Sequence, residues 1–154
     1  MLMSGVMRVA SQPLFDILPL RPHLIAPEQV GAVTGRFANE GFRIVRVQSG
    51  RLPAGAAEDI LGEIAKALGF PAEGPVNWAA FNDWLGDFLV DEEDPVAIVV
   101  YGLDAMLRRD VHVYLGCVHG LLGMTEAYRS PDFPDLAQLE YIFPGSWTPI
   151  GGKA

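Results

Sequence analysis

The stretch Leu68–Gly102, "LGFPAEGPVNWAAFNDWLGDFLVDEEDPVAIVVYG", places a turn, an amphipathic helix and a strand in direct succession. Asn77 suits the start of the helix because its side-chain oxygen can accept a hydrogen bond from the first turn. Large apolar side chains then recur at helical spacing: Phe81, Trp84, Leu85 and Phe88. The run "DPVAIVVYG" is short and rich in β-branched residues, which is typical of a strand covered on both faces.

The rest of the chain alternates between the same two kinds of pattern. Helical patterns cover residues 26–42, 53–70, 77–89 and, in two pieces, 103–130; strand patterns cover residues 42–50, 94–102 and 136–145. Residues 1–25 contain three prolines and no sustained period, and read as an irregular arm with one short strand near "LFDIL". Strands separated by helical crossovers predict an α/β fold, with helices packed on a small parallel sheet.

Length and composition narrow the class of protein. A chain of 154 residues has the size of one domain. Its apolar runs are shorter than the roughly 18 to 20 residues that span a bilayer, and its first residues do not form a signal peptide pattern. The single cysteine, Cys117, has no second cysteine to pair with. We therefore expect a cytoplasmic protein that does not enter a membrane.

The negative charge is concentrated in one part of the chain. The chain has 19 acidic residues, and the part of it between Ala67 and Leu107 contains acidic residues but no Lys or Arg. In the rest of the chain, acidic and basic residues are equal in number. The formal net charge of −8 therefore belongs to this segment. Such a field repels a nucleic-acid backbone and attracts a basic protein.

The stretch "IAKALGFPAEGPVNWAAFNDWLGDF", residues 64–88, resembles the barstar family, the intracellular inhibitors of barnase-type ribonucleases. The resemblance rests on eight positions: Leu68, Pro71, Asn77, Trp78, Ala80, Phe81, Asp83 and Leu85. A looser likeness covers residues 42–143. It implies a barstar-like three-stranded parallel sheet with packed helices. The expected division is an N-terminal arm with an extra helix at 1–41, the barstar-like domain at 42–144 and a tail at 145–154.

The resemblance also implies a function, that of an immunity protein without enzymatic activity, cofactor or metal. The helix at 77–89 and the loop at 70–76 would block the basic active site of a cognate toxin or nuclease, and the free inhibitor would be a monomer. The partner-binding residues that it implies are Glu73, Asn77, Trp78, Ala79, Asn82, Asp83 and Asp87. Asp83 takes the place of the family's central acid. This chain departs from the family at Ala79, where members commonly carry a second acid, and at the loop "EGPV".

Other interpretations stay open at this point. The acidic helix face can be a solvated surface with no partner, and the target can be a toxin other than a ribonuclease. A self-associating regulatory module, built on the apolar residues of the arm, is a further hypothesis. His112, Cys117 and His119 form a weak set of metal ligands or catalytic groups, and the more ordinary interpretation is a buried cysteine with two histidines that have no special role.

Overall fold

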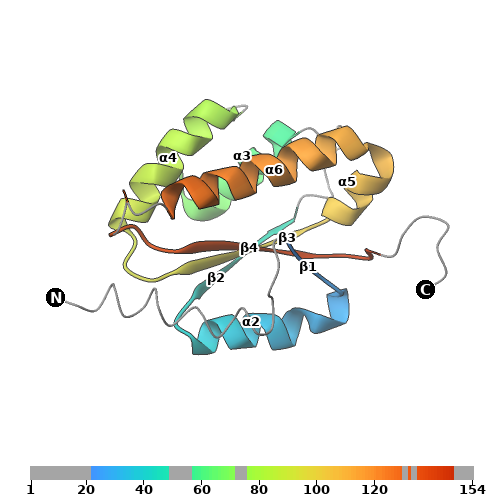
Figure 1. The fold of residues 1–154 in the computed structure, drawn as a ribbon, viewed down its shortest axis with the longest axis horizontal. Helices are drawn as coiled ribbons and strands as arrows, with labels where there is room; N and C mark the ends of the chain where they lie inside the picture. Colours follow the sequence, from blue (N-terminus) through green and yellow to red (C-terminus); the bar gives the residue numbers. More distant parts are fainter. Residues whose placement is uncertain (1–21, 49–56, 72–75, 130–131, 133–134, 148–154) are drawn as a thin grey trace.

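The computed structural model describes residues 22–48, 57–71, 76–129, 132 and 135–147 (Figure 1). Its elements, in chain order, are β1 (His23–Ile25), the 3₁₀ turn η2 (Pro27–Gln29), α2 (Val30–Asn39), β2 (Arg43–Gln48), α3 (Ala57–Leu68), α4 (Trp78–Asp91), β3 (Val96–Tyr101), α5 (Leu103–Arg109), α6 (Val111–Tyr128) and β4 (Leu139–Pro144). The predicted strand near "LFDIL" lies outside the described residues. Within them, no helix is long and apolar enough to span a bilayer.

The described strands form one sheet in the order β1-β4-β3-β2, and every neighbouring pair is parallel. The expectation of a parallel sheet in an α/β fold is confirmed, but the expected three-stranded sheet is wrong because the sheet has four strands. The fourth strand is β1, whose His23 lies opposite Ile142 of β4. Strand β1 has three residues and is flanked by Pro22 and Pro27, so it is too short to show an alternating pattern in the sequence.

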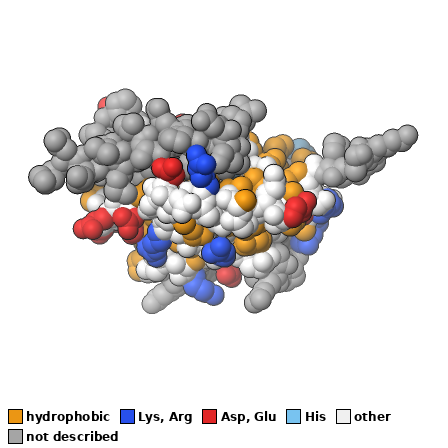
Figure 2. All heavy atoms as spheres, turned by 90° about the horizontal axis from the view of Figure 1, so that it is seen from below, with side chains coloured by type: hydrophobic (Ala, Val, Ile, Leu, Met, Phe, Trp, Pro, Cys, Tyr) orange, Lys and Arg blue, Asp and Glu red, His pale blue; other side chains and the backbone are white. Residues whose placement is uncertain are grey.

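Both faces of the sheet are covered. Helices α3, α4, α5 and α6 lie on one face and α2 on the other, as Figure 1 shows. Strand β3 alternates between two hydrophobic clusters, with Ile98 in the larger one and Val99 in the one under α2. Seen from the α2 side, acidic and basic side chains are intermixed among hydrophobic ones (Figure 2). The packing explains why β3 reads as a continuous apolar run.

The helix boundaries follow from capping. Asn77 accepts a hydrogen bond from the backbone N–H of Ala80 at 2.8 Å, which confirms it as the N-cap of α4. Asp110 divides the long helical stretch into α5 and α6, and its carboxylate accepts from the N–H groups of His112 and Val113. The prediction of two helical pieces between 103 and 130 is therefore confirmed. The division into arm, domain and tail at residues 42 and 144 stays a prediction.

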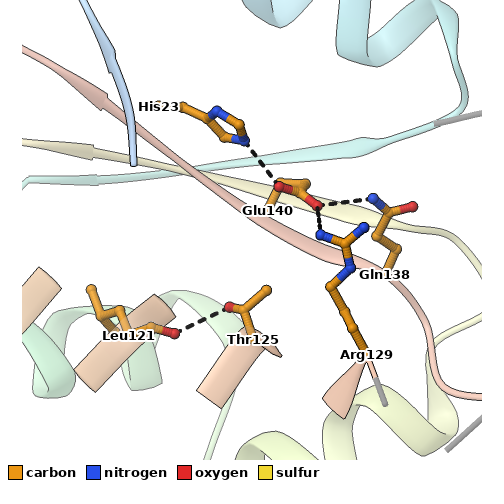
Figure 3. A network of polar contacts seen from close by, with 6 residues as sticks. All are labelled: His23, Leu121, Thr125, Arg129, Gln138 and Glu140. Carbon is orange, nitrogen blue, oxygen red and sulfur yellow. Dashed lines mark hydrogen bonds and ion pairs between the residues drawn. The ribbon is translucent and has the colours of Figure 1, made fainter. Parts of the chain in front are cut away.

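A buried polar network joins β1 and α6 to β4 (Figure 3). Residue Glu140 is 3% exposed, and one oxygen of its carboxylate lies 3.0 Å from His23 Nε2. Its other oxygen accepts from Gln138 Nε2 at 2.9 Å and pairs with Arg129 at 3.5 Å. Because a buried carboxylate is costly unless it is paired and hydrogen-bonded, these contacts stabilise the first strand and the end of α6 against β4.

Candidate functional site

Helix α4 is attached to the rest of the protein by its aromatic side chains. Phe70, which follows the end of α3, lies between three rings of α4: Phe81 at 5.7 Å, Trp84 at 6.1 Å and Phe88 at 5.8 Å between ring centroids. Tilted and edge-to-face pairs at these distances add to the gain from apolar burial. The cluster therefore fixes α4 against the end of α3.

Trp78 provides a second attachment, to α6. Its ring lies so close to Gly120 that a Cβ added there would be 2.6 Å from Cζ3 and 2.9 Å from Cζ2. Real Cβ contacts are essentially never closer than 3.0 Å, so only glycine accommodates the ring at this position. Trp78 is half-buried, with Phe81 fully buried behind it. The aromatic residues of this helix therefore belong chiefly to the core side.

The opposite side of α4 is acidic and open. Ala79, Asp83 and Asp87 are exposed at intervals of four residues, so they form one line along the helix. Asp91 continues the line at the end of the helix. Among the described residues, neither Asp83 nor Asp87 makes an ion pair. We name the surface formed by Ala79, Asp83 and Asp87 the acidic face.

The other residues predicted to bind a partner lie in different surroundings. Asn77 is exposed, but its side chain caps the helix. Trp78 packs on Gly120, and Asn82 is half-buried and contacts Tyr128 of α6. Glu73 lies outside the described residues. The structure thus brings Ala79, Asp83 and Asp87 together, while Asn82 supports the helix from the side of α6.

Tyr128, at the last position of α6, is a residue that sequence reasoning missed. Its hydroxyl lies 2.9 Å from the backbone oxygen of Asn82 and 3.1 Å from Asn82 Oδ1. Burial, followed by the negative charges of Asp83 and Asp87, raises the pKa of the Tyr128 phenol. The residues are 46 positions apart in the sequence, and no local pattern signals this contact.

The residues that favoured a metal or enzymatic site do not come together. Cys117 is fully buried, whereas His112 and His119 are exposed. Burial raises the pKa of the Cys117 thiol to about 12, so it is not a thiolate nucleophile at neutral pH. Within the described residues, no group of three or more His, Cys, Asp or Glu side chains could hold a metal ion.

Among solved structures, the fold is similar to that of the ORC2 protein of Aeropyrum pernix, described as ADPNP-ADP complexes. The match has a TM-score of 0.58 and 18% sequence identity, and covers 92% of this chain but only 39% of that chain. At this identity the likeness shows the fold alone. Together with the fourth strand, it contradicts the three-stranded architecture that the sequence led us to expect.

Despite this likeness in fold, the sequence of this chain does not contain the P-loop motif for nucleotide binding. A P-loop needs the pattern G-x-x-x-x-G-K-[ST], in which the lysine and the hydroxyl contact the phosphates and Mg²⁺. Between β2 and α3 this chain has two glycines at that spacing, Gly50 and Gly55, but they are followed by Ala56 and Ala57. The two side chains that would hold phosphate and metal in a P-loop are therefore absent from this sequence.

No protein of curated function matches the sequence significantly. A family model does: the one described as "Barstar (barnase inhibitor)" matches residues 53–133, just over half of the chain. The matched range includes α3, all of α4 with its acidic face, β3, α5 and α6. Members of that family are inhibitors and not enzymes. The protein described here belongs to the barstar family.

Proposed function

We propose that this protein is an immunity protein that inhibits a toxin by placing the acidic face of α4 in the toxin's basic active site, and that the toxin is a barnase-type ribonuclease. The observation that carries the proposal is the exposure of Asp83 and Asp87 on a helix whose other sides are fixed by aromatic packing. In this proposal the free protein is a cytoplasmic monomer.

The physical basis is imitation of a phosphate backbone by carboxylates. Carboxylates that stand one helical turn apart present anionic oxygens at a fixed spacing, and Arg or Lys side chains of a nuclease site bind such oxygens through charge-assisted hydrogen bonds. Among the described residues, neither Asp83 nor Asp87 makes an ion pair that would compete with a partner. Because α4 is already rigid, little conformational entropy is lost on binding.

The residues have separate roles in this proposal. Asp83 is the central anion and Asp87 its neighbour, and Glu73 adds a charge from the loop before α4. The remaining contacts shape the surface: Asn77, Trp78, Ala79 and Asn82. The segment from Ala67 to Leu107, which carries the net charge, accelerates association with a basic partner, an effect that salt weakens.

The test is inhibition and binding of barnase by the full chain. Wild-type protein is expected to suppress RNA cleavage by barnase and to bind it in calorimetry. Asp83→Lys is expected to weaken binding by about a hundredfold or more, because it places a cation against cations. Glu93→Lys makes the same change of charge at an exposed site after α4, and is expected to retain most of the affinity. Equal affinity of wild type and Asp83→Lys would reject the acidic face as the binding surface.

A toxin that is not a ribonuclease is the second candidate target. The observation that favours it is Ala79, a small exposed residue on the acidic face at the position where the family commonly carries an acid. A pull-down with the wild-type chain is expected to recover the cognate toxin, and the toxin is expected to be lost when the experiment is repeated with Asp83→Lys or at high salt. Incubating that toxin with RNA then distinguishes the two targets, because only a ribonuclease degrades it.

A further inference from the structure

Tyr128 bridges the last turn of α6 and the middle of α4. Its hydroxyl contacts Asn82 through both the backbone oxygen and the side-chain oxygen, at 2.9 and 3.1 Å. Its ring lies over Gly86, one turn further along α4. A Cβ added at Gly86 would be 3.0 Å from the hydroxyl and 3.4 Å from Cζ. The tyrosine therefore occupies the space above Asn82 and Gly86, two positions one helical turn apart on the flank of α4, next to Asp83 and Asp87.

The hydrogen bonding at Asn82 can be assigned from its donors and acceptors. A phenol hydroxyl carries one hydrogen and cannot donate to two oxygens at once. The backbone oxygen is the nearer acceptor, so the hydroxyl donates to it. Asn82 Oδ1, at 3.1 Å, is the second acceptor within reach of the same hydroxyl. The contact between the end of α6 and the backbone of Asn82 restricts the rotation of α4 about its axis.

The position of Tyr128 is itself secured by the neighbouring residue. Arg129, at the C-cap of α6, pairs with the buried Glu140 of β4, which also contacts His23 of β1 (Figure 3). The end of α6 is thus attached to the sheet through Arg129 and to α4 through Tyr128. A shift of this turn would move the side of α4 that carries the acids.

We infer that Tyr128 is a positioning residue of the inhibitory surface: by holding Asn82 and covering Gly86, it sets the direction in which Asp83 and Asp87 face a cationic partner. The inference rests on the proposed function, because it gives Tyr128 its role through the acidic face. It predicts that part of the affinity depends on a hydroxyl that need not touch the partner.

The variant that tests the inference is Tyr128→Phe, which keeps the ring over Gly86 and removes only the hydroxyl. Tyr114→Phe is the matched control, because it removes a hydroxyl from the same helix at a buried site where the ring lies beside Trp147. Affinity for barnase is expected to fall about tenfold in Tyr128→Phe and to change little in the control. Equal affinity of wild type and Tyr128→Phe overturns the inference.

A double-mutant cycle separates positioning from general destabilisation. If Tyr128 acts through Asp83, the affinity lost in Tyr128→Phe is expected to be smaller in the Asp83→Asn background than in wild type. Fully additive losses would mean that the hydroxyl does not act through Asp83, and would overturn the inference.

A partner-free measurement keeps the test separate from the proposed function. Titration of the Tyr128 phenol, followed by NMR of the ¹³Cζ-labelled ring, is expected to give a lower pKa in Asp83→Asn and in Asp87→Asn than in wild type. If barnase binds no form of the protein, the ribonuclease target fails, yet this titration still decides the geometry. Titration curves unchanged by both substitutions would overturn the inference.

Discussion

Replacing Gly120 by alanine is expected to disturb the acidic face from the opposite side of the helix. The new Cβ would lie 2.6 Å from Trp78 Cζ3, whereas ordinary contacts begin at 3.4 Å. The indole must therefore move, and it belongs to the first turn of α4. Overpacking of this kind costs about 1–3 kcal/mol, and the better helix propensity of alanine returns up to about 1 kcal/mol.

Two glycines of the same helix provide the controls. Gly116 and Gly123 are exposed, and a Cβ at either would meet nothing within 4 Å. Their alanine variants keep the gain in helix propensity without the clash, so each is expected to stabilise the protein by up to about 1 kcal/mol. The contrast between Gly120→Ala and the two controls is therefore about 1–3 kcal/mol, whatever the exact propensity term.

Urea denaturation of the three variants measures this contrast, and calorimetry with barnase measures its effect on binding. Gly120→Ala is expected to be the least stable and to bind most weakly, because the first turn of α4 shifts with Trp78. The indole ¹H–¹⁵N resonance of Trp78 should move in this variant alone. If Gly120→Ala is as stable as Gly116→Ala and the indole resonance is unchanged, α4 is not held on α6 by this contact.

Three further substitutions test the interior. Tyr141→Phe is expected to stabilise the fold by about 1 kcal/mol, because the buried Tyr141 hydroxyl has no hydrogen-bond partner within the described part of the chain; a loss of stability in urea denaturation would reveal an unseen partner. Burial raises the pKa of the Cys117 thiol from 9.0 to about 12. The thiol's contribution to the free energy of unfolding is therefore complete below pH 9 and is lost as the pH rises to 12. Cys117→Ala should therefore flatten the alkaline part of a stability profile that otherwise falls by up to about 4 kcal/mol; a profile as steep as that of wild type would assign the fall to other groups. Glu140→Gln weakens the pairs with His23 and Arg129, and is expected to destabilise the protein by on the order of 3 kcal/mol, with calorimetric unfolding as the measurement; an unchanged Tm would show that hydrogen bonding alone suffices there.

The parts of the fold that sequence reasoning predicted are those with local physical causes. The predicted N-cap at Asn77 follows from one side chain and one neighbouring N–H. The division of residues 103–130 into two helices was predicted without its position, and it follows from Asp110 in the same way. The apolar run of β3 reflects burial on both faces. Such features depend on residues a few positions apart, so their signal is present in the linear sequence.

The features that were missed depend on partners far away in the chain. Strand β1 is three residues long and exists as a strand only through its pairing with β4. Tyr128 reads as one more residue of a mostly apolar helix until Asn82 is placed beside it. In the sequence, Gly120 likewise appears only as a residue of low helix propensity within α6. The contact with the Trp78 ring explains why a glycine is needed there. Periodicity carries no information about these contacts.

The combination of aromatic and acidic residues in α4 has a physical explanation. Asp83 and Asp87 are like charges at i and i+4, which destabilises a helix by about 0.2–0.5 kcal/mol, and Asp91 lies at the C-terminus, where the helix dipole disfavours an anion. The acids therefore do not stabilise α4, and the packing of Phe81, Trp84 and Phe88 around Phe70 offsets their cost. The exposed line of acids weakens its own helix, and aromatic packing on the other side holds that helix in place. This arrangement fits a surface selected for binding a cationic protein partner and not for stability.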